Sequence, residues 1–491
     1  MTPTFVVEVK TLLSAAGPFE GGLLLLKLPL LSREIPAQNT TAVLPHYALL
    51  TISALACAVA AQGGYYLPGR VVVAVMVAGA LVLALRTQPW SRSDAGLVLL
   101  SCTGLAVWAV ARAVMGGFPV AAIPTVVTLA CLAGAVVVIG RIDSGQRELC
   151  AVAAVGVGVL IAITGWIGAA WRIQPWALPV QGIWRASSTL TYANAAAAML
   201  ASLSVLACGL LLARPRSLAR AAATYALLVG LAATLSRGGL VAMLAGLLLL
   251  SVLAGVRATA WHLAPAIAGA TVAFGALIGS LPAPAQPRPI LAVLGLVVGL
   301  MITLALTRLP HRVRAAAVAA TLALVTVGFA TQIVAGQTMQ VLIGDRANLD
   351  SMGRSGAAHA AMRMVAARPI LGVGPGQARF QWAAADGREV VARYAHNEYL
   401  QVLVELGAIG LILLLAVLAA MAIHVRRGRA DAQPPMIWAG AVAALAALLV
   451  HSGFDFLWQL PVIPLTGGLL VALASPVTSK NHAITIGKEQ R

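Results

Sequence analysis

The fold is decided by the stretch Tyr394-Ala-His-Asn-Glu-Tyr-Leu-Gln-Val-Leu-Val-Glu-Leu-Gly407, where a long polar segment meets an apolar run. The residues that follow, Ala-Ile-Gly-Leu-Ile-Leu-Leu-Leu-Ala, predict a helix that crosses a membrane. Ionisable and amide groups are costly in hydrocarbon, so a cluster of them at a helix entrance indicates a functional site. The cluster consists of His396, Asn397, Gln401 and Glu405.

Composition extends this conclusion to the whole chain. Of the 491 residues, 60% are hydrophobic and only 10% are charged, and the mean hydropathy is +0.93. We therefore expect an all-α polytopic integral membrane protein with about 12–14 transmembrane helices and one long extracytoplasmic loop. The net charge of +18 is spread over short loops, which indicates contact with membrane lipids and argues against nucleic acid as a partner.

The apolar runs define the expected organisation. Residues 1–41 are expected to form a cytoplasmic or interfacial segment without a cleavable signal peptide, and 476–491 a cytoplasmic tail. The first membrane helices are expected within 42–170. The predicted spans are 42–61, 71–85, 95–115, 119–140, 149–170, 189–213, 219–235, 239–256, 261–281, 290–307, 314–336, 398–423, 435–451 and 459–475.

Basic residues orient these spans. With the spans above, three dense clusters fall on one side of the membrane, and the positive-inside rule assigns that side to the cytoplasm. The loop 337–397 and the segments 187–194 and 236–239 then lie outside, as does Asp455. The clusters are Arg214/Arg216/Arg220, Arg308/Arg312/Arg314 and Arg426/Arg427/Arg429. Unusual polar residues thus converge on the outer face, which predicts one extracytoplasmic active site in the cytoplasmic membrane.

Three of these outer residues have two possible roles each. Arg237 lies in Ser-Arg-Gly-Gly, where it can cap a helix end or bind phosphate through its planar guanidinium. Asn194 begins a span, where it can cap the helix or contact a ligand. Asp455 can orient a basic partner or hold its loop.

Within the long loop, Ala357–Ala367 predicts a short helix that ends before Pro369.

His396 is the candidate base. An imidazole titrates near neutral pH and suits proton removal from a hydroxyl. Behind it, Asn397, Gln401 and Glu405 step by four residues and share one helix face. The motif has no second histidine at metal-site spacing, and the five cysteines form no CxxC pair, so neither a metal site nor a cofactor is expected.

Together these motifs resemble the O-antigen ligase/O-antigen polymerase superfamily. The resemblance covers roughly residues 180–475 and rests on the order and spacing of four pieces. These are Ser-Arg237-Gly-Gly-Leu, Arg354 ahead of Pro-Ile-Leu-Gly-Val-Gly-Pro-Gly376, the His396 stretch, and His451-Ser-Gly-Phe-Asp455. The chain departs from many members in lacking a Trp shortly after the loop arginine, since 355–359 read Ser-Gly-Ala-Ala-His.

The resemblance implies a metal-independent, inverting glycosyltransferase. Its donor would be a glycan on undecaprenyl diphosphate, and its acceptor a hydroxyl of lipid A-core or of another glycan or lipid. Carried over position by position, Arg237 and Arg354 would bind the diphosphate and His396 would activate the acceptor. Asn397, Gln401, Glu405, Asp455 and Asn194 are expected as supporting residues.

Two alternatives stay open at this stage. The donor half of the site would be the same in a polymerase, whose acceptor is a second lipid-linked repeat. The second alternative is a small-anion transporter, but transporters place charged groups at the midplane of the membrane, between inverted repeats. Here no repeat is visible, and Glu405 alone lies deep in a predicted span.

Overall fold

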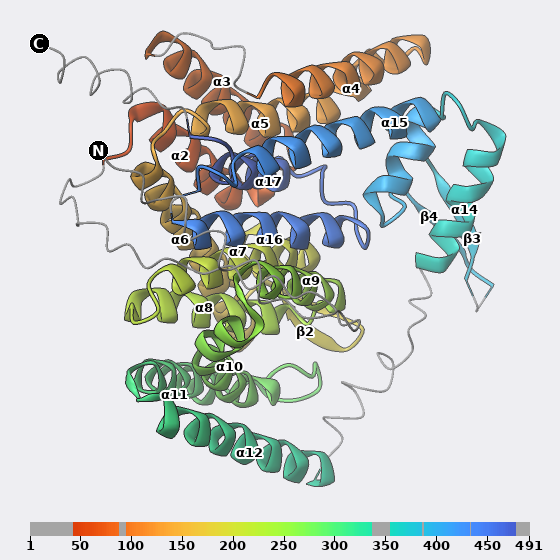
Figure 1. Cartoon of the computed structure of the whole chain (residues 1–491). Coiled ribbons are helices and arrows are strands. Elements are labelled where there is room, and N and C mark those ends of the chain that lie inside the picture. The colour runs from red at the N-terminus through yellow and green to blue at the C-terminus, as the bar shows by residue number, and fades with distance from the viewer. Residues whose placement is uncertain (1–42, 88–94, 336–353, 385–386, 433, 478–491) are drawn as a thin grey trace, which may run out of the picture. The chain divides into compact units, whose positions relative to one another are not determined.

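The computed structural model describes residues 43–87, 95–335, 354–384, 387–432 and 434–477, which are mainly helical (Figure 1). The expected segment 1–41, nearly all of the tail 476–491 and the first part of the loop 337–397 lie outside this part of the chain. The long helices are α2 (His46–Ala60), α3 (Leu67–Thr87), α4 (Gly96–Met115), α5 (Ile123–Ile139), α6 (Ser144–Trp171), α7 (Ala193–Ala213), α8 (Leu218–Thr234), α9 (Arg237–Ala254), α10 (Val256–Ile278), α11 (Pro289–Arg308), α12 (His311–Ala335), α15 (Glu398–Arg427), α16 (Pro435–Ser452) and α17 (Val462–Leu473).

Each of the predicted spans overlaps one of these helices. Among the described residues, ten helical segments are long and apolar enough to cross a membrane, and α2, α8 and α17 are shorter apolar helices. The protein is therefore an all-α polytopic membrane protein, as its composition predicts. The remaining elements are short: η1 (Gln62–Gly64), η2 (Pro119–Ala122), η3 (Ser188–Leu190), α14 (Arg354–Ala367), and the strands β1 (Ala177–Val180), β2 (Ile183–Ala186), β3 (Phe380–Ala383) and β4 (Glu389–Ala392).

Helix α7 is the most buried of the candidate spans. Its apolar window is 94% buried, and it packs against α8, α9 and α16. The sequence of α7 is rich in alanine, which lets neighbouring backbones approach closely. At the contact with α16, a Cβ on Gly209 would lie 2.5 Å from the Cα of Gly440. This packing fixes the start of α7, where Asn194 lies, against the end of α16.

The described part of the long loop has a small core of its own. The helix expected at 357–367 is confirmed as α14, which packs against β3 and against α15. Antiparallel strands β3 and β4 pair Phe380 with Ala392, and Phe380 is fully buried. The indole of Trp382 lies directly against Gly356, where a Cβ would come within 2.3 Å of it. An indole from β3 thus covers α14 just after Arg354, in the region where the chain departs from the family pattern.

Helix α15 is broken at Gly407, which the sequence analysis did not anticipate. Gly407 has φ 69° and ψ −169°, a conformation open mainly to glycine. The segment that precedes the strands inserts at the break, since the N–H of Val373 donates to the carbonyl of Val404 and the N–H of Ala408 donates to that of Pro369. Trp108 of α4 donates its indole N–H to the carbonyl of Leu406. The carbonyls freed by the break are therefore satisfied by protein groups.

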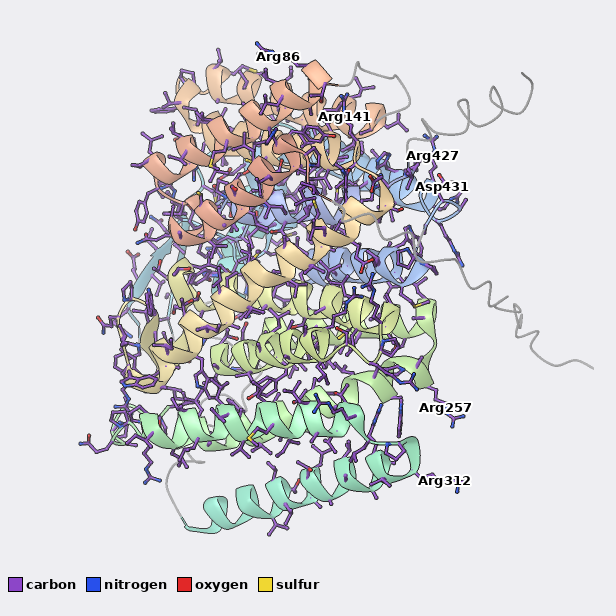
Figure 2. All side chains as sticks on the ribbon, turned by 90° about the vertical axis from the view of Figure 1, so that its left-hand side faces the viewer. Arg86, Arg141, Arg257, Arg312, Arg427 and Asp431 are labelled. Atoms are coloured by element: carbon purple, nitrogen blue, oxygen red, sulfur yellow. The ribbon has the colours of Figure 1, made fainter. Side chains whose placement is uncertain are left out.

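The expected basic clusters lie at the helix ends opposite to those where Asn194 and His396 lie. Figure 2 shows Arg257, Arg312 and Arg427 toward the same side of the helices.

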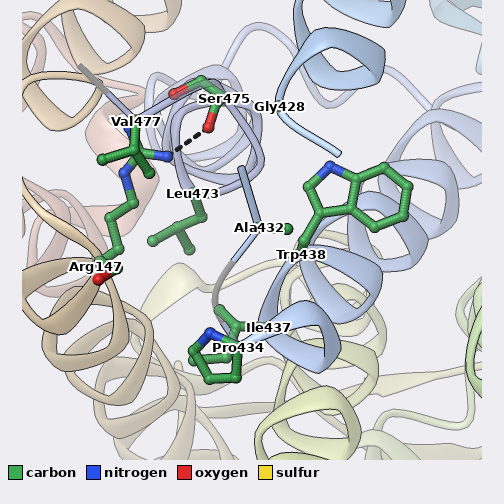
Figure 3. A pocket seen from close by; sticks show the side chains of 10 residues that line it. Arg147, Gly428, Ala432, Pro434, Ile437, Trp438, Leu473, Ser475 and Val477 are labelled. Carbon is green, nitrogen blue, oxygen red and sulfur yellow. Dashed lines mark hydrogen bonds between the residues drawn. The ribbon is translucent and has the colours of Figure 1, made fainter. Parts of the chain in front are cut away.

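On this side the buried guanidinium of Arg147 on α6 donates to the carbonyls of Ser475 and Pro476, beside a cavity of about 20 Å³ (Figure 3). That volume accommodates about one water molecule. Arg147 therefore ties the end of α17 to α6, and we assign it a structural role.

Candidate functional site

The site is built around the carboxylate of Asp455, in the turn between α16 and α17. Its side chain is fully buried and accepts hydrogen bonds from four donors. Nδ1 of His396 lies 3.0 Å from Oδ1, and the main-chain N–H of Phe456 lies 2.9 Å from the same oxygen. The hydroxyl of Tyr192 and the side-chain amide of Asn194 both donate to Oδ2. Residues far apart in the sequence thus meet at one carboxylate.

This environment keeps Asp455 ionised. Burial alone would raise the pKa of a carboxyl group, but the hydrogen bonds from His396 and Tyr192 outweigh it and hold the pKa of Asp455 below its ordinary value. Burial and the neighbouring negative charge of Asp455 raise the pKa of Tyr192, so the phenol stays protonated and donates. The carboxylate is a fixed negative charge at the centre of the site.

The structure holds the ring of His396 in a defined orientation. The residue has φ 52°, in the left-handed region that few non-glycine residues adopt. The centre of its ring lies 5.1 Å from that of Phe456 in an edge-to-face contact. Phe456 is itself stacked on Tyr394 and Tyr192. The side chain is 31% exposed. Because Nδ1 faces Asp455, the opposite edge of the ring is the one available to a substrate.

A chain of polar contacts connects Asp455 to the start of α9. The side-chain oxygen of Asn194 accepts from Nη2 of Arg185 at 2.9 Å and from the hydroxyl of Ser236 at 3.2 Å. Ser236 is the N-cap of α9 and accepts from the N–H of Gly239. Arg237, the next residue, is exposed at the first position of the helix. Helix capping is therefore done by Ser236, and the side chain of Asn194 binds neighbouring side chains and does not cap α7.

Arg354 lies in the long loop, at the start of its helix. It is the first residue of α14 and is half-buried. Its positive charge opposes the effect of burial on the pKa of Tyr192, and it also acts on His451. His451 in turn lies beside the start of α9, since a Cβ on Gly238 would be 3.6 Å from its Nε2. Arg354 therefore has a minor electrostatic effect on Tyr192 and on His451, the residue beside the start of α9.

The polar stripe on α15 supports the segment that carries His396. Asn397 caps the helix by accepting from the N–H of Leu400 at 3.0 Å. Gln401 accepts from the N–H of Ala395 at 2.8 Å and donates to Glu405 at 2.7 Å. The expected shared face is therefore present for Gln401 and Glu405, whereas Asn397 turns to its own helix end. These residues hold the backbone around His396 and do not contact Asp455.

Sequence reasoning missed three residues of this site. Arg185, on β2, also donates to the carbonyl of Thr234 at 2.9 Å and thereby connects the start of α7 to the end of α8. Tyr192 and Phe456 are the other two. Tyr192 lies two residues before Asn194, and Phe456 directly follows Asp455, so the only signal in the sequence was that each lies close to a candidate residue. Nothing in the sequence around Arg185 marks it.

The arrangement combines an imidazole with positively charged side chains. His396 has a buried carboxylate partner in Asp455, and the arginines of this region are Arg185, Arg237 and Arg354. Within the described residues no group of three or more His, Cys, Asp or Glu side chains is placed to hold a metal ion. Such a set suits the transfer of a group from a phosphate leaving group to a hydroxyl.

Comparison with known families gives one match over part of the chain. No curated protein matches the chain. Residues 290–415 match the family model described as O-antigen ligase. The matched segment runs from α11 into α15 and contains Arg354, His396, Gln401 and Glu405, whereas Arg237 and Asp455 lie outside it. Over residues 290–415, this match confirms the resemblance to the O-antigen ligase/O-antigen polymerase superfamily that the sequence motifs indicate.

Proposed function

We propose that the protein is an O-antigen ligase-type glycosyltransferase of the cytoplasmic membrane. It would move a glycan from undecaprenyl diphosphate to an acceptor hydroxyl, such as one on lipid A-core, at the extracytoplasmic face. The observation that carries this proposal is the contact between Nδ1 of His396 and the buried carboxylate of Asp455. The family match supports the class of reaction.

The contact fixes the chemistry of the imidazole. An ionised carboxylate can only accept hydrogen bonds, so the proton of neutral His396 resides on Nδ1. Nε2 then has a free lone pair on the exposed side of the ring. Asp455 also stabilises the imidazolium that forms when Nε2 takes a proton. His396 is therefore prepared to act as a general base.

The proposed reaction is a single displacement. The acceptor hydroxyl gives its proton to Nε2 of His396 while its oxygen forms a bond to the anomeric carbon. The bond from that carbon to the phosphate oxygen breaks, and its electron pair leaves with undecaprenyl diphosphate. Attack from the face opposite the leaving group inverts the anomeric configuration.

The arginines stabilise the leaving group in this scheme. Negative charge grows on the bridging phosphate oxygen as the glycosidic bond breaks, and guanidinium groups bind phosphate oxygens in a bidentate manner. Arg237 and Arg354 would make these contacts, because Arg237 is exposed at the start of α9 and Arg354 is close enough to Tyr192 to act on it electrostatically. Arg185 is held by Asn194 and Thr234, so we assign it to positioning.

The proposal is tested by transfer with purified components. The full chain in detergent is given an undecaprenyl-diphosphate glycan and either lipid A-core or a second lipid-linked glycan, with and without chelator. Transfer to lipid A-core with inverted anomeric configuration, unaffected by chelator, supports the ligase. Chain extension with the second lipid-linked glycan alone would instead establish a polymerase. Retention of configuration, or a requirement for added metal, would overturn the mechanism.

A further inference from the structure

A second candidate site lies at the helix ends opposite to those that surround Asp455, and its charged groups are all basic. A cavity of about 870 Å³ opens between the start of α10 and the start of α12. Its walls include Gly255 and Arg257 from the α10 end and Arg312 from the α12 end, with Trp261 one turn further along α10. It belongs to the side where Figure 2 shows Arg257 and Arg312 on neighbouring helix ends.

The lining of this cavity is basic. Arg257 and Arg312 are exposed, and none of the residues that line the cavity is acidic. Within the described residues neither arginine takes part in an ion pair. Two guanidinium groups that face one opening without a carboxylate between them favour an anionic ligand with phosphate-like oxygens.

The backbone at this point adds to the positive potential. Helix α10 begins after Gly255, which has φ 97° and offers no side chain to cap the first N–H groups. The positive end of the helix dipole therefore faces the same opening as the arginines. This contribution is secondary to the two charged side chains, which define the site.

Apolar surface adjoins the charged groups. The indole of Trp261 forms part of the cavity wall, and the buried guanidinium of Arg314 lies 5.3 Å from the centre of its ring. Val256 is 68% exposed and Val313 is 51% exposed, on the two helices that frame the opening. Positive charge beside exposed aliphatic side chains suits an amphiphile better than a free anion.

We propose that this cavity binds the headgroup of an anionic phospholipid. The lipid phosphate would lie between Arg257 and Arg312, and an acyl chain would cover the exposed valines. A basic pocket between helix ends at the membrane surface has the charge and position that such headgroups require. The inference is independent of the proposed transfer reaction, because it concerns a separate set of residues.

The test is lipid binding to the full chain in a neutral detergent. Phosphatidylglycerol is titrated while thermal stability is followed, with phosphatidylcholine as the neutral lipid and glycerol 3-phosphate as the soluble anion. Phosphatidylglycerol should stabilise the protein at the lowest concentration. Each of Arg257→Gln and Arg312→Gln should weaken its apparent affinity about fivefold, and the double variant roughly 25-fold, if each arginine contributes about 1 kcal/mol.

Two further variants make the result decisive. Arg216→Gln removes an exposed arginine of the same predicted face outside the cavity and should leave the titration unchanged. The double Lys variant keeps both charges and should retain most of the effect, which separates lost binding from misfolding. Equal stabilisation of wild type and the double Gln variant would overturn the proposal. An equal effect of glycerol 3-phosphate would overturn it too, since the ligand would then be a soluble anion.

Discussion

The backbones of Gly407 and Ile370 touch across the break in α15, because a Cβ on Gly407 would lie only 2.1 Å from the carbonyl oxygen of Ile370. The main chain of Ile370 also accepts from the N–H of Ile409 beyond the break. The contact joins the end of the α14 segment, which begins with Arg354, to the helix that begins just after His396. One glycine therefore couples the arginine-bearing loop to the helix behind the candidate base.

We expect Gly407→Ala to disrupt this coupling. Alanine disfavours φ 69°, at a cost of about 1–3 kcal/mol, and its methyl group would also collide with Ile370. The variant should show a lower melting temperature in detergent and strongly reduced transfer. Gly156→Ala is the matched control, since a Cβ at Gly156 meets nothing within 4 Å. Normal activity in Gly407→Ala would mean that the loop docks without the glycine.

If Arg237 and Arg354 bind the diphosphate, the rate of glycan transfer should depend on which side chain stands at each position. Each Ala variant should abolish glycan transfer without affecting membrane insertion, because the diphosphate loses its charge partner. Lys variants should recover only part of the activity, since an ammonium lacks the planar pair of donors. Arg363→Ala, on the exposed side of α14, removes a charge from the same helix and should retain activity. Full activity in Arg354→Ala would show that Arg354 is only a surface residue of the loop and does not bind the diphosphate.

The general-base role predicts that His396→Ala loses turnover but keeps donor binding. General acid–base catalysis is worth about 10²–10⁴-fold, so kcat should fall by that factor. Binding of the undecaprenyl-diphosphate glycan, measured directly in detergent, should change little because the arginines hold the phosphates. A variant that turns over normally would remove His396 from the chemistry and leave the family assignment untouched.

The sequence predicted the helices well but the site only in part. Apolar runs such as 398–423 mark spans directly, because hydrocarbon imposes length and composition together. His396 and Asp455 were each identified, but no residue pattern shows that they touch, since that contact depends on how α15 packs beside the turn after α16. The break at Gly407 was missed for a similar reason, because its cause is the inserted segment at Ile370. Arg185 lies in a short hairpin whose position only the folded chain defines.

The ionisation of Asp455 predicts how stability depends on pH. Its pKa is lowered in the folded protein, so its ionised form stabilises the fold. This stabilisation is fully present above the ordinary aspartate pKa of about 4 and is lost as the pH falls through the lower folded-state value. The melting temperature of wild type should exceed that of Asp455→Asn at pH 6, and the difference should shrink below about pH 4. A difference that stays constant down to pH 3 would show that the carboxylate charge contributes nothing.

Membrane orientation is the prediction on which the extracytoplasmic site rests. Reporter fusions should place residue 365 outside, and residues 217, 311 and 428 inside, because this arrangement puts the three arginine clusters in the cytoplasm. Residue 365 belongs to α14, so its location also reports that of Arg354. A lipid-linked diphosphate glycan displayed outside the cell membrane can reach the arginines and His396 only in this orientation. Detection of residues 311 and 365 on the same face would remove a span between them and invert one half of the site relative to the other.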